Sequence, residues 1–205
     1  MPSEESRLIE TLRVFCILAM MWVHVNPGMS SASIVTTGEY ALVGAVLGNT
    51  LGRVSVSLLS FISGYLLWQR ARDIAFGRYV MRRFRTVLVP MLVWSALYIL
   101  LAVMKEPLTG STARKIAGIG PDAVSLANAW AGITGSTANP SLFFLRDLFV
   151  ASLILRLAVP LVERAPVLVA AVVLVAATGD ALQPLVFRAS ILQFLFFGAV
   201  AARLG

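Results

Sequence analysis

The sequence TVLVPMLVWSALYILLAVM, at residues 86–104, contains no charged residue and decides the fold class. A bilayer has a hydrocarbon core roughly 30 Å thick, and a helix that crosses it needs about 20 apolar residues. This stretch is therefore predicted to be a membrane-spanning helix. The whole chain has the same character, because 59% of its residues are apolar and 13% are charged, whereas about a quarter of the residues in soluble domains are charged.

Five further apolar stretches have a similar character. We predict an all-α protein, a polytopic transmembrane helix bundle of about six helices, in which residues 1–205 form one domain. The predicted spans are residues 8–25, 45–69, 86–104, 141–161, 165–179 and 185–202. Gly44, Gly48 and Gly52 have the small-xxx-small spacing that lets helix backbones approach closely, so we interpret them as packing positions.

The distribution of positive charge predicts the orientation. Residues 70–85, between the second and third spans, contain six arginines and one aspartate. Because short loops rich in Lys and Arg stay in the cytoplasm, this loop and both termini are predicted to be cytoplasmic. Residues 105–140 then form an outward-facing loop, rich in Gly, Ser, Thr, Asn and Pro. The net charge of +7 is explained by this topology, and we expect no nucleic-acid partner.

Arg13 and His24, two of the ionisable side chains in the first span, lie on one helix face. Eleven residues separate them, which in an α-helix is a rotation of about 20° from alignment and a rise of about 16 Å. Ionisable groups within a span normally face a bundle interior or a wet cavity, where they have partners and functions. The alternative is that Arg13 extends to the lipid headgroups and His24 lies at the opposite interface, so that both anchor the helix.

Four stretches carry a resemblance to a known family. The first comprises Leu12-Arg13-Val14-Phe15 and Met21-Trp22-Val23-His24-Val25; the second is Phe61-Ile62-Ser63-Gly64-Tyr65-Leu66-Leu67; the third comprises Arg82-Arg83-Phe84-Arg85, Val89-Pro90 and Trp94-Ser95; the fourth is Leu142-Phe143-Phe144-Leu145-Arg146-Asp147-Leu148. In this order they resemble the acyltransferase 3 family, membrane enzymes that O-acylate carbohydrates and other surface molecules. Phe143 stands where the family usually has tryptophan.

The resemblance implies a multi-pass O-acyltransferase of the bacterial inner membrane. Its expected reaction is the transfer of an acyl group, acetyl in the simplest case, from cytoplasmic acyl-coenzyme A to a hydroxyl of a surface polysaccharide or its lipid-linked precursor. Acyl-coenzyme A (acetyl-CoA) would be a co-substrate, and no bound cofactor is expected. The resemblance also implies about ten spans, so we expect these residues to be the front part of a longer enzyme, or the missing helices to be supplied elsewhere.

The candidate catalytic residues are His24 and Arg13. A hydroxyl nucleophile needs a base, and histidine, with an ordinary pKa near 6.5, can take its proton near neutral pH. Arg13 is expected to bind the phosphates of the donor, because arginine makes bidentate phosphate contacts. Arg83 and Arg85 are candidate substrate-binding residues on the same side. The alternative for these two is that they only satisfy the positive-inside rule.

Arg53 and Arg146 are further candidate substrate-binding residues, because each lies within or at the edge of a span, where its charge needs a partner. For Arg146 the alternative is an interfacial anchor. An ion pair between Arg146 and Asp147 is not expected, since neighbouring side chains on a helix point about 100° apart.

Other chemistry is less well supported by the sequence. One Cys and one His cannot supply the three or four ligands of a zinc site, so no metal is expected. Ser63-Gly64 lacks the G-x-S-x-G context of a nucleophile and is interpreted as helix packing. Two other functions stay open. The first is a small transporter, although no internal repeat is visible, and the second is a noncatalytic membrane anchor or sensor module.

Overall fold

The computed structural model describes residues 4–25, 50, 52–109, 119–120, 122–134, 137–139, 141–178, 186 and 188–205. Every regular element within these residues is helical, which confirms the all-α class. In chain order they are α1 (Glu4–Val25), α3 (Gly52–Ala71), α4 (Phe76–Arg83), the π-helical segment η2 (Phe84–Leu88), α5 (Val89–Thr109), α7 (Ala123–Ala131), α8 (Phe143–Arg164), α9 (Pro166–Thr178) and α10 (Ala189–Leu204).

Each of the six predicted spans contains a helix, namely α1, α3, α5, α8, α9 and α10. Among the described residues one helix, Phe76–Pro107, is long and apolar enough to cross a membrane, judged by length and composition. Pro166–Ala177 and α10 are apolar but shorter. The six-span bundle therefore remains a prediction. Gly44 and Gly48, at the start of the second span, lie outside the described residues.

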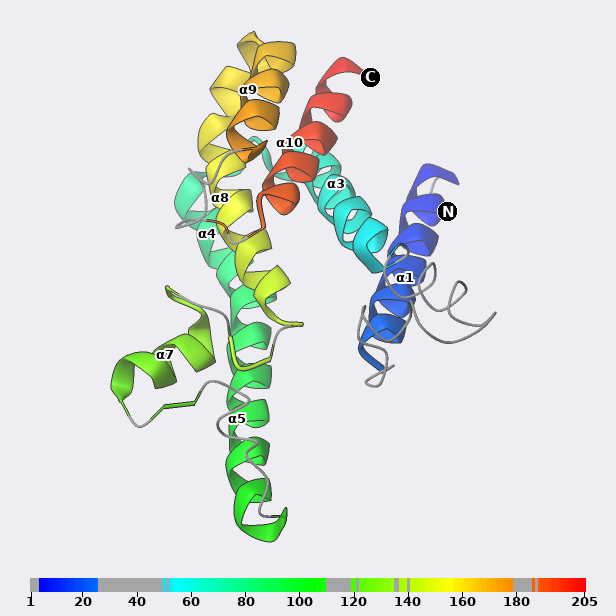
Figure 1. The fold of residues 1–205 in the computed structure, drawn as a ribbon. Coiled ribbons are helices and arrows are strands. Elements are labelled where there is room, and N and C mark those ends of the chain that lie inside the picture. Colours follow the sequence, from blue (N-terminus) through cyan, green and yellow to red (C-terminus); the bar gives the residue numbers. More distant parts are fainter. Residues whose placement is uncertain are drawn as a thin grey trace.

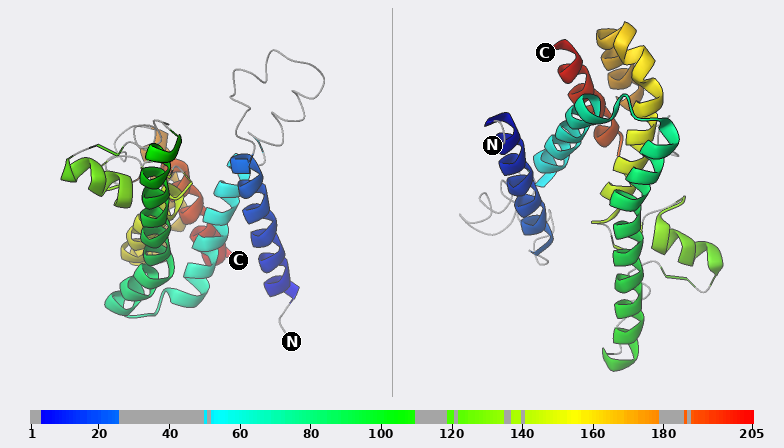
Figure 2. Two further views of the ribbon diagram at one scale, coloured as in Figure 1. Left: turned by 90° about the horizontal axis from the view of Figure 1, so that it is seen from below. Right: turned by 180° about the vertical axis from the view of Figure 1, so that it is seen from behind.

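Apart from α7, which lies beside α5, the helices run alternately up and down in Figure 1, with α4, η2 and α5 counted as one helix. In the view of Figure 1 both chain ends, the α3–α4 turn and the α8–α9 junction lie toward the upper end of the molecule. Helix α5 extends to its lower end (Figures 1 and 2). Helix α3 packs most extensively against α10 and also against α1, while α10 contacts α8 and α9. The core between these helices is apolar and includes Leu67, Trp68, Leu155, Ile191 and Leu195.

Two glycines allow the close crossing of α3 and α10. A Cβ atom on Gly64 would overlap the carbonyl oxygen of Leu195, and one on Gly198 would overlap the carbonyl oxygen of Phe61. The two backbones therefore touch where a side chain would otherwise separate them. The interpretation of Gly64 as a packing position is confirmed.

The arginine-rich segment is largely helical, and its prediction as a loop was wrong. Residues 72–75 alone separate α3 from α4, and the chain then continues through α4, η2 and α5 as one helix. Arginine favours helices, and the segment is amphipathic, since Tyr79 and Val87 are buried while Arg78, Arg82 and Arg85 are exposed.

Pro90 accounts for the π-helical segment η2. Proline has no N–H to donate to the carbonyl of Thr86, four residues earlier, and its ring crowds that carbonyl. Instead the N–H of Val89 donates to the carbonyl oxygen of Phe84, which is the five-residue spacing of a π turn. The helix therefore accommodates the proline by widening.

The predicted outward loop also contains a helix, α7. The side chain of Asp122 accepts a hydrogen bond of 2.8 Å from the N–H of Ser125 and caps α7. This bond holds the pKa of the Asp122 carboxyl below its ordinary value. Gly132 ends the helix with a left-handed φ of 62°, and the indole Nε1–H of Trp130 donates to the Leu92 carbonyl oxygen of α5 at 2.9 Å.

Apolar side chains cover much of the outer surface. Val93, Trp94 and Leu101 of α5 are more than half exposed, as are Leu168 and Val175 of α9. A soluble monomer rarely exposes large contiguous apolar areas, whereas lipid-facing helices do so without cost. This surface favours a membrane location.

Candidate functional site

A cavity of about 250 Å³ lies between α1, α3, α4 and η2. Four arginines contribute to its lining, one from α1, one from α3 and two from α4. They are Arg13, Arg70, Arg82 and Arg83, and the other lining residues are Ser63, Leu66, Leu67, Tyr79 and Thr86. We call this cavity, with these nine residues, the arginine cavity.

Helix geometry explains how the sequence gathers these residues. Ser63, Leu67 and Arg70 recur at intervals of four and three, so they share one face of α3. Tyr79 and Thr86, seven residues apart, lie on one face of the α4–η2 helix. The short turn at residues 72–75 brings these two faces together, and α1 beside α3 adds Arg13.

The arginine cavity is strongly electropositive. None of the described residues that line it is acidic. Within the described part of the chain Arg72 pairs with Asp73 and Arg146 pairs with Asp147, and no ion pair there involves a cavity arginine. Four like charges around one space repel each other. An anion that carries several charges would therefore be stabilised there.

Tyr79 holds the guanidinium group of Arg83 in place through two contacts. The Nε–H of Arg83 donates to the Tyr79 hydroxyl at 2.9 Å, and the guanidinium carbon lies 5.6 Å from the centroid of the tyrosine ring. Tyr79 is 1% exposed, and its hydroxyl in turn donates to the carbonyl oxygen of Ser152 in α8 at 3.5 Å. The guanidinium is thus tied to a buried ring and through it to another helix.

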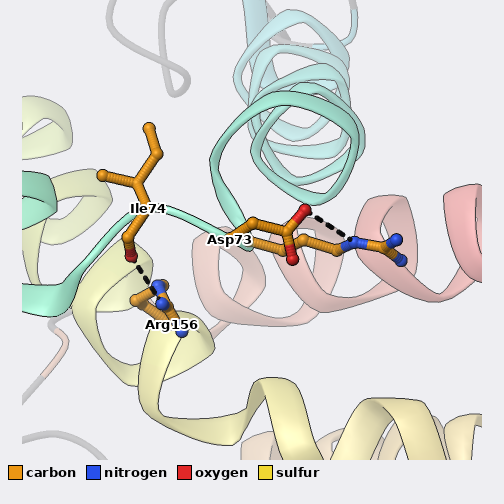
Figure 3. A network of polar contacts seen from close by, with 4 residues as sticks. Asp73, Ile74 and Arg156 are labelled. Carbon is orange, nitrogen blue, oxygen red and sulfur yellow. Dashed lines mark hydrogen bonds and ion pairs between the residues drawn. The ribbon is translucent and has the colours of Figure 1, made fainter.

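A second contact holds the start of α4 against α8. Nη2 of Arg156 donates to the carbonyl oxygen of Ile74 at 2.6 Å, and Figure 3 shows this guanidinium beneath the turn that precedes α4. The ion pair between Arg72 and Asp73, at 3.4 Å, lies in the same turn but is exposed. Helix α8 therefore supports the side of the arginine cavity that α4 forms.

The structure brings together two of the predicted site residues, Arg13 and Arg83. Arg85 is exposed on η2 and is not among the residues that line the cavity. His24 belongs to α1 and Arg53 to α3, but their side chains lie outside the described part of the structure. Arg13 and His24 do occupy one uninterrupted helix, as expected.

Arg70 and Arg82 line the cavity although neither was a candidate site residue in the sequence analysis. Both belong to the arginine-rich segment at residues 70–85, and Arg82 lies in the third family-like stretch, but their charge was attributed to topology. The seven-residue spacing from Ser63, in the second family-like stretch, to Arg70 was a usable signal, because it places both on one face of a helix.

Arg146 lies elsewhere and corrects one expectation. Its Nη1 forms an ion pair of 2.8 Å with Oδ1 of Asp147, which is fully buried. The long arginine side chain can turn back to its neighbour even though the two Cβ atoms diverge. Oδ2 of Asp147 accepts the N–H of Arg188 at 2.9 Å, and the Arg188 guanidinium lies 4.5 Å from the ring centroid of Phe143. This pair joins the starts of α8 and α10.

Comparisons with known proteins agree with the resemblance seen in the sequence. The acyltransferase 3 family model, described as "Acyltransferase domain", matches residues 7–205. The chain is 32% identical over 182 residues to the succinoglycan biosynthesis protein ExoH of Rhizobium meliloti (strain 1021). That alignment covers 81% of this chain and 45% of ExoH, so the chain spans about half the length of this relative. No solved structure matches the chain.

Proposed function

This chain belongs to the acyltransferase 3 family, and we propose that the protein containing it transfers an acyl group from cytoplasmic acyl-coenzyme A to a hydroxyl of a cell-surface polysaccharide or its lipid-linked precursor. The acyl group that we propose for this reaction is acetyl. The observation that carries the proposal is the arginine cavity. The name of the relative ExoH, a succinoglycan biosynthesis protein, supports a polysaccharide acceptor.

The arginine cavity suits the donor by charge. Coenzyme A carries several negative charges on its phosphates, and arginine binds phosphate through two parallel N–H groups of its planar fork. Arg13, Arg70, Arg82 and Arg83 surround the cavity, and Leu66 and Leu67 give it an apolar wall. Such a wall suits the part of acyl-coenzyme A that carries the thioester, which is less polar than its phosphates.

The position of the cavity suits a cytoplasmic donor. Arginine-rich connections remain on the cytoplasmic side of a membrane, and α4 carries Arg78, Arg82 and Arg83 next to the α3–α4 turn. In Figure 1 this turn lies toward the same end as both chain ends. We therefore propose an inner-membrane protein with a cytoplasmic N-terminus and the arginine cavity on the cytoplasmic side.

His24 is proposed as the base. It follows Arg13 along α1 by about 16 Å, toward the side from which a surface glycan would approach. Its neutral imidazole takes the proton of the acceptor hydroxyl, whose oxygen attacks the thioester carbonyl carbon. The new C–O bond forms as the C–S bond breaks, and the proton passes to the departing coenzyme A sulfur. Histidine suits this transfer because its ordinary pKa lies near neutrality.

The donor site is tested with acetyl-CoA in membranes that contain the full-length protein. Arg82→Ala should raise the KM for acetyl-CoA roughly tenfold, the scale of one charge-assisted hydrogen bond, and leave the KM for the glycan acceptor unchanged. Arg78→Ala removes the same charge from α4 at an exposed position that does not line the cavity. Equal effects of the two substitutions, or none, would contradict the donor assignment.

The base is tested separately with His24→Ala. General-base catalysis contributes about 10² to 10⁴ in rate, so kcat should fall by that factor while acetyl-CoA binding and protein abundance stay near normal. If a well-expressed His24→Ala protein transfers acetyl at the wild-type rate, His24 is not the base.

A further inference from the structure

We propose that Tyr79 is a positioning residue of the donor site, which holds the Arg83 guanidinium at the arginine cavity and fixes α4 on α8. This rests on the proposed function, because it assumes that Arg83 binds the anionic part of the acyl donor. Tyr79 would not touch the reacting atoms. Its effect would pass through Arg83.

The first support is the complete use of the Tyr79 hydroxyl. A buried tyrosine hydroxyl can donate one hydrogen bond and accept others, and buried polar groups are normally paired. Here it accepts from Nε of Arg83 at 2.9 Å and donates to the Ser152 carbonyl oxygen at 3.5 Å. An apolar residue of the same shape would fill the space. The hydroxyl therefore links an arginine of the cavity to α8.

The second support is what this contact does to Arg83. The guanidinium has five N–H groups, and the bond to Tyr79 uses the one on Nε. The four N–H groups on the two Nη atoms form the edge that binds a phosphate in a bidentate manner. The guanidinium also lies within cation–π distance of the ring, at 5.6 Å. A fork held in this way loses less freedom when an anion binds.

The third support is a two-point attachment of α4 to α8. Ser152 and Arg156 are four residues apart and share one face of α8. The Ser152 carbonyl accepts from Tyr79, and Arg156 donates to the Ile74 carbonyl in the turn before α4 (Figure 3). Two attachments prevent α4 from rotating about either one. They fix how the α4 arginines face Arg70 of α3 across the cavity.

The test uses the full-length protein in lipid nanodiscs and labelled acetyl-CoA as the probe. Tyr79→Phe keeps the ring and removes the hydroxyl. It should raise the Kd and the KM for acetyl-CoA roughly three- to tenfold, the size of one ordinary hydrogen bond, because the loss reaches the donor only through Arg83. The kcat and the acceptor KM should not change. Tyr98→Phe makes the same chemical change at an exposed tyrosine of α5 and should have no effect.

Two further variants decide whether Tyr79 acts through Arg83. Arg83→Lys keeps the charge but has no Nε–H to donate, so it should weaken acetyl-CoA binding by at least as much as Tyr79→Phe. In the Arg83→Ala background, Tyr79→Phe should cause no additional loss, since residues that act as a unit are not additive. Additive losses, wild-type binding by Tyr79→Phe, or a fall in kcat that follows a lower melting temperature would each overturn the proposal.

The same data distinguish this proposal from the one on which it rests. If Arg83→Ala binds acetyl-CoA like the wild type, the arginine cavity is not the donor site and the proposed function fails. If Arg83→Ala weakens binding but Tyr79→Phe does not, the donor site stands and only the role of Tyr79 is lost.

Discussion

Asp147 joins two helices through its two carboxylate oxygens. Oδ1 pairs with Arg146 on α8, and Oδ2 accepts the backbone N–H of Arg188 at the start of α10. Asp147 is fully buried, and the Arg146 side chain is 11% exposed. A buried charge is tolerated when its partner and hydrogen bonds are complete, and removal of one partner leaves the other uncompensated.

Asp147→Asn should therefore lower the free energy of unfolding by roughly 3–5 kcal/mol, the usual cost of breaking a buried ion pair from one side. Denaturant unfolding of the purified protein in detergent measures this. Asp73→Asn is the matched control, because it breaks an ion pair whose aspartate side chain is 89% exposed, and exposed pairs contribute little. Similar losses for both variants would contradict the structural role of Asp147.

At this scale the sequence singled out two of the residues that line the arginine cavity, Arg13 and Arg83. Arg13 stood out because a charge within an apolar span is costly, and Arg83 stood out through the family-like stretch that contains it. Arg82 lies in the same stretch and Arg70 lies outside all four stretches, but neither was chosen as a candidate because the charge of both was attributed to topology. The contact between Arg146 and Asp147 depends on side-chain torsions, which sequence spacing does not specify.

The crossing of α3 and α10 depends on the absence of side chains at two positions. Gly64→Ala would place a methyl group against the Leu195 carbonyl oxygen, so the helices must separate. We expect a destabilisation of about 1–3 kcal/mol, as for other overpacked sites. Gly77→Ala in α4 meets nothing within 4 Å and should be neutral or slightly stabilising, because alanine favours helices. Thermal unfolding of both variants provides the comparison, and equal melting temperatures would refute the packing role.

Helix α7 should respond to acid through its cap. Because the Ser125 N–H lowers the pKa of Asp122 in the folded protein from its ordinary value of 3.8, the capping contribution is complete above that ordinary value. It is lost as the pH falls through the lower, folded-state pKa. Hydrogen exchange of the α7 amides should therefore show less protection at strongly acidic pH, after correction for intrinsic rates. In Asp122→Ala this pH dependence should disappear; if it persists, another group is responsible.

Most elements could be predicted because apolar runs long enough for helices are visible in the sequence. The third predicted span began at residue 86, ten residues after the helix begins at Phe76 in the structure, because the arginines before residue 86 were interpreted as a loop. In the structure their charge is compatible with a helix whose other face, at Tyr79 and Val87, is buried. Helix α7 was missed because it is short and the polar residues around it resemble a loop.

The arginine cavity is a property of the whole molecule and could not be predicted in full. Arg13 and Arg70 belong to different helices, and only the packing of α1 against α3 places both beside α4. The sequence shows which residues are charged and which stretches form helices, but it does not show which helix faces pack against one another. By contrast, the concentration of arginines near the α3–α4 turn could be predicted, because six of them lie within residues 70–85.

The orientation of the molecule is tested by labelling single cysteines, with Cys16 replaced by alanine. Arg78→Cys, on α4, should react with an impermeant reagent only when the cytoplasmic face is accessible. Ser111→Cys, in the connection after α5 and outside the described residues, should react in intact spheroplasts. Labelling of both from one face would rule out the alternating arrangement and with it the cytoplasmic position of the arginine cavity.

The π turn at η2 also has a consequence for insertions and deletions in the gene. A π turn takes up one residue more than an α turn, so the loss of one codon within residues 84–88 would remove the widened turn that precedes Pro90. Because the wide turn absorbs its extra residue, α4 and α5 would keep nearly the same rotation about the helix axis, and Arg82 and Arg83 would still face the cavity. Pro90 would then crowd a carbonyl in a turn of ordinary width, so the helix would kink there and α5 would change direction while the arginine cavity stayed in place.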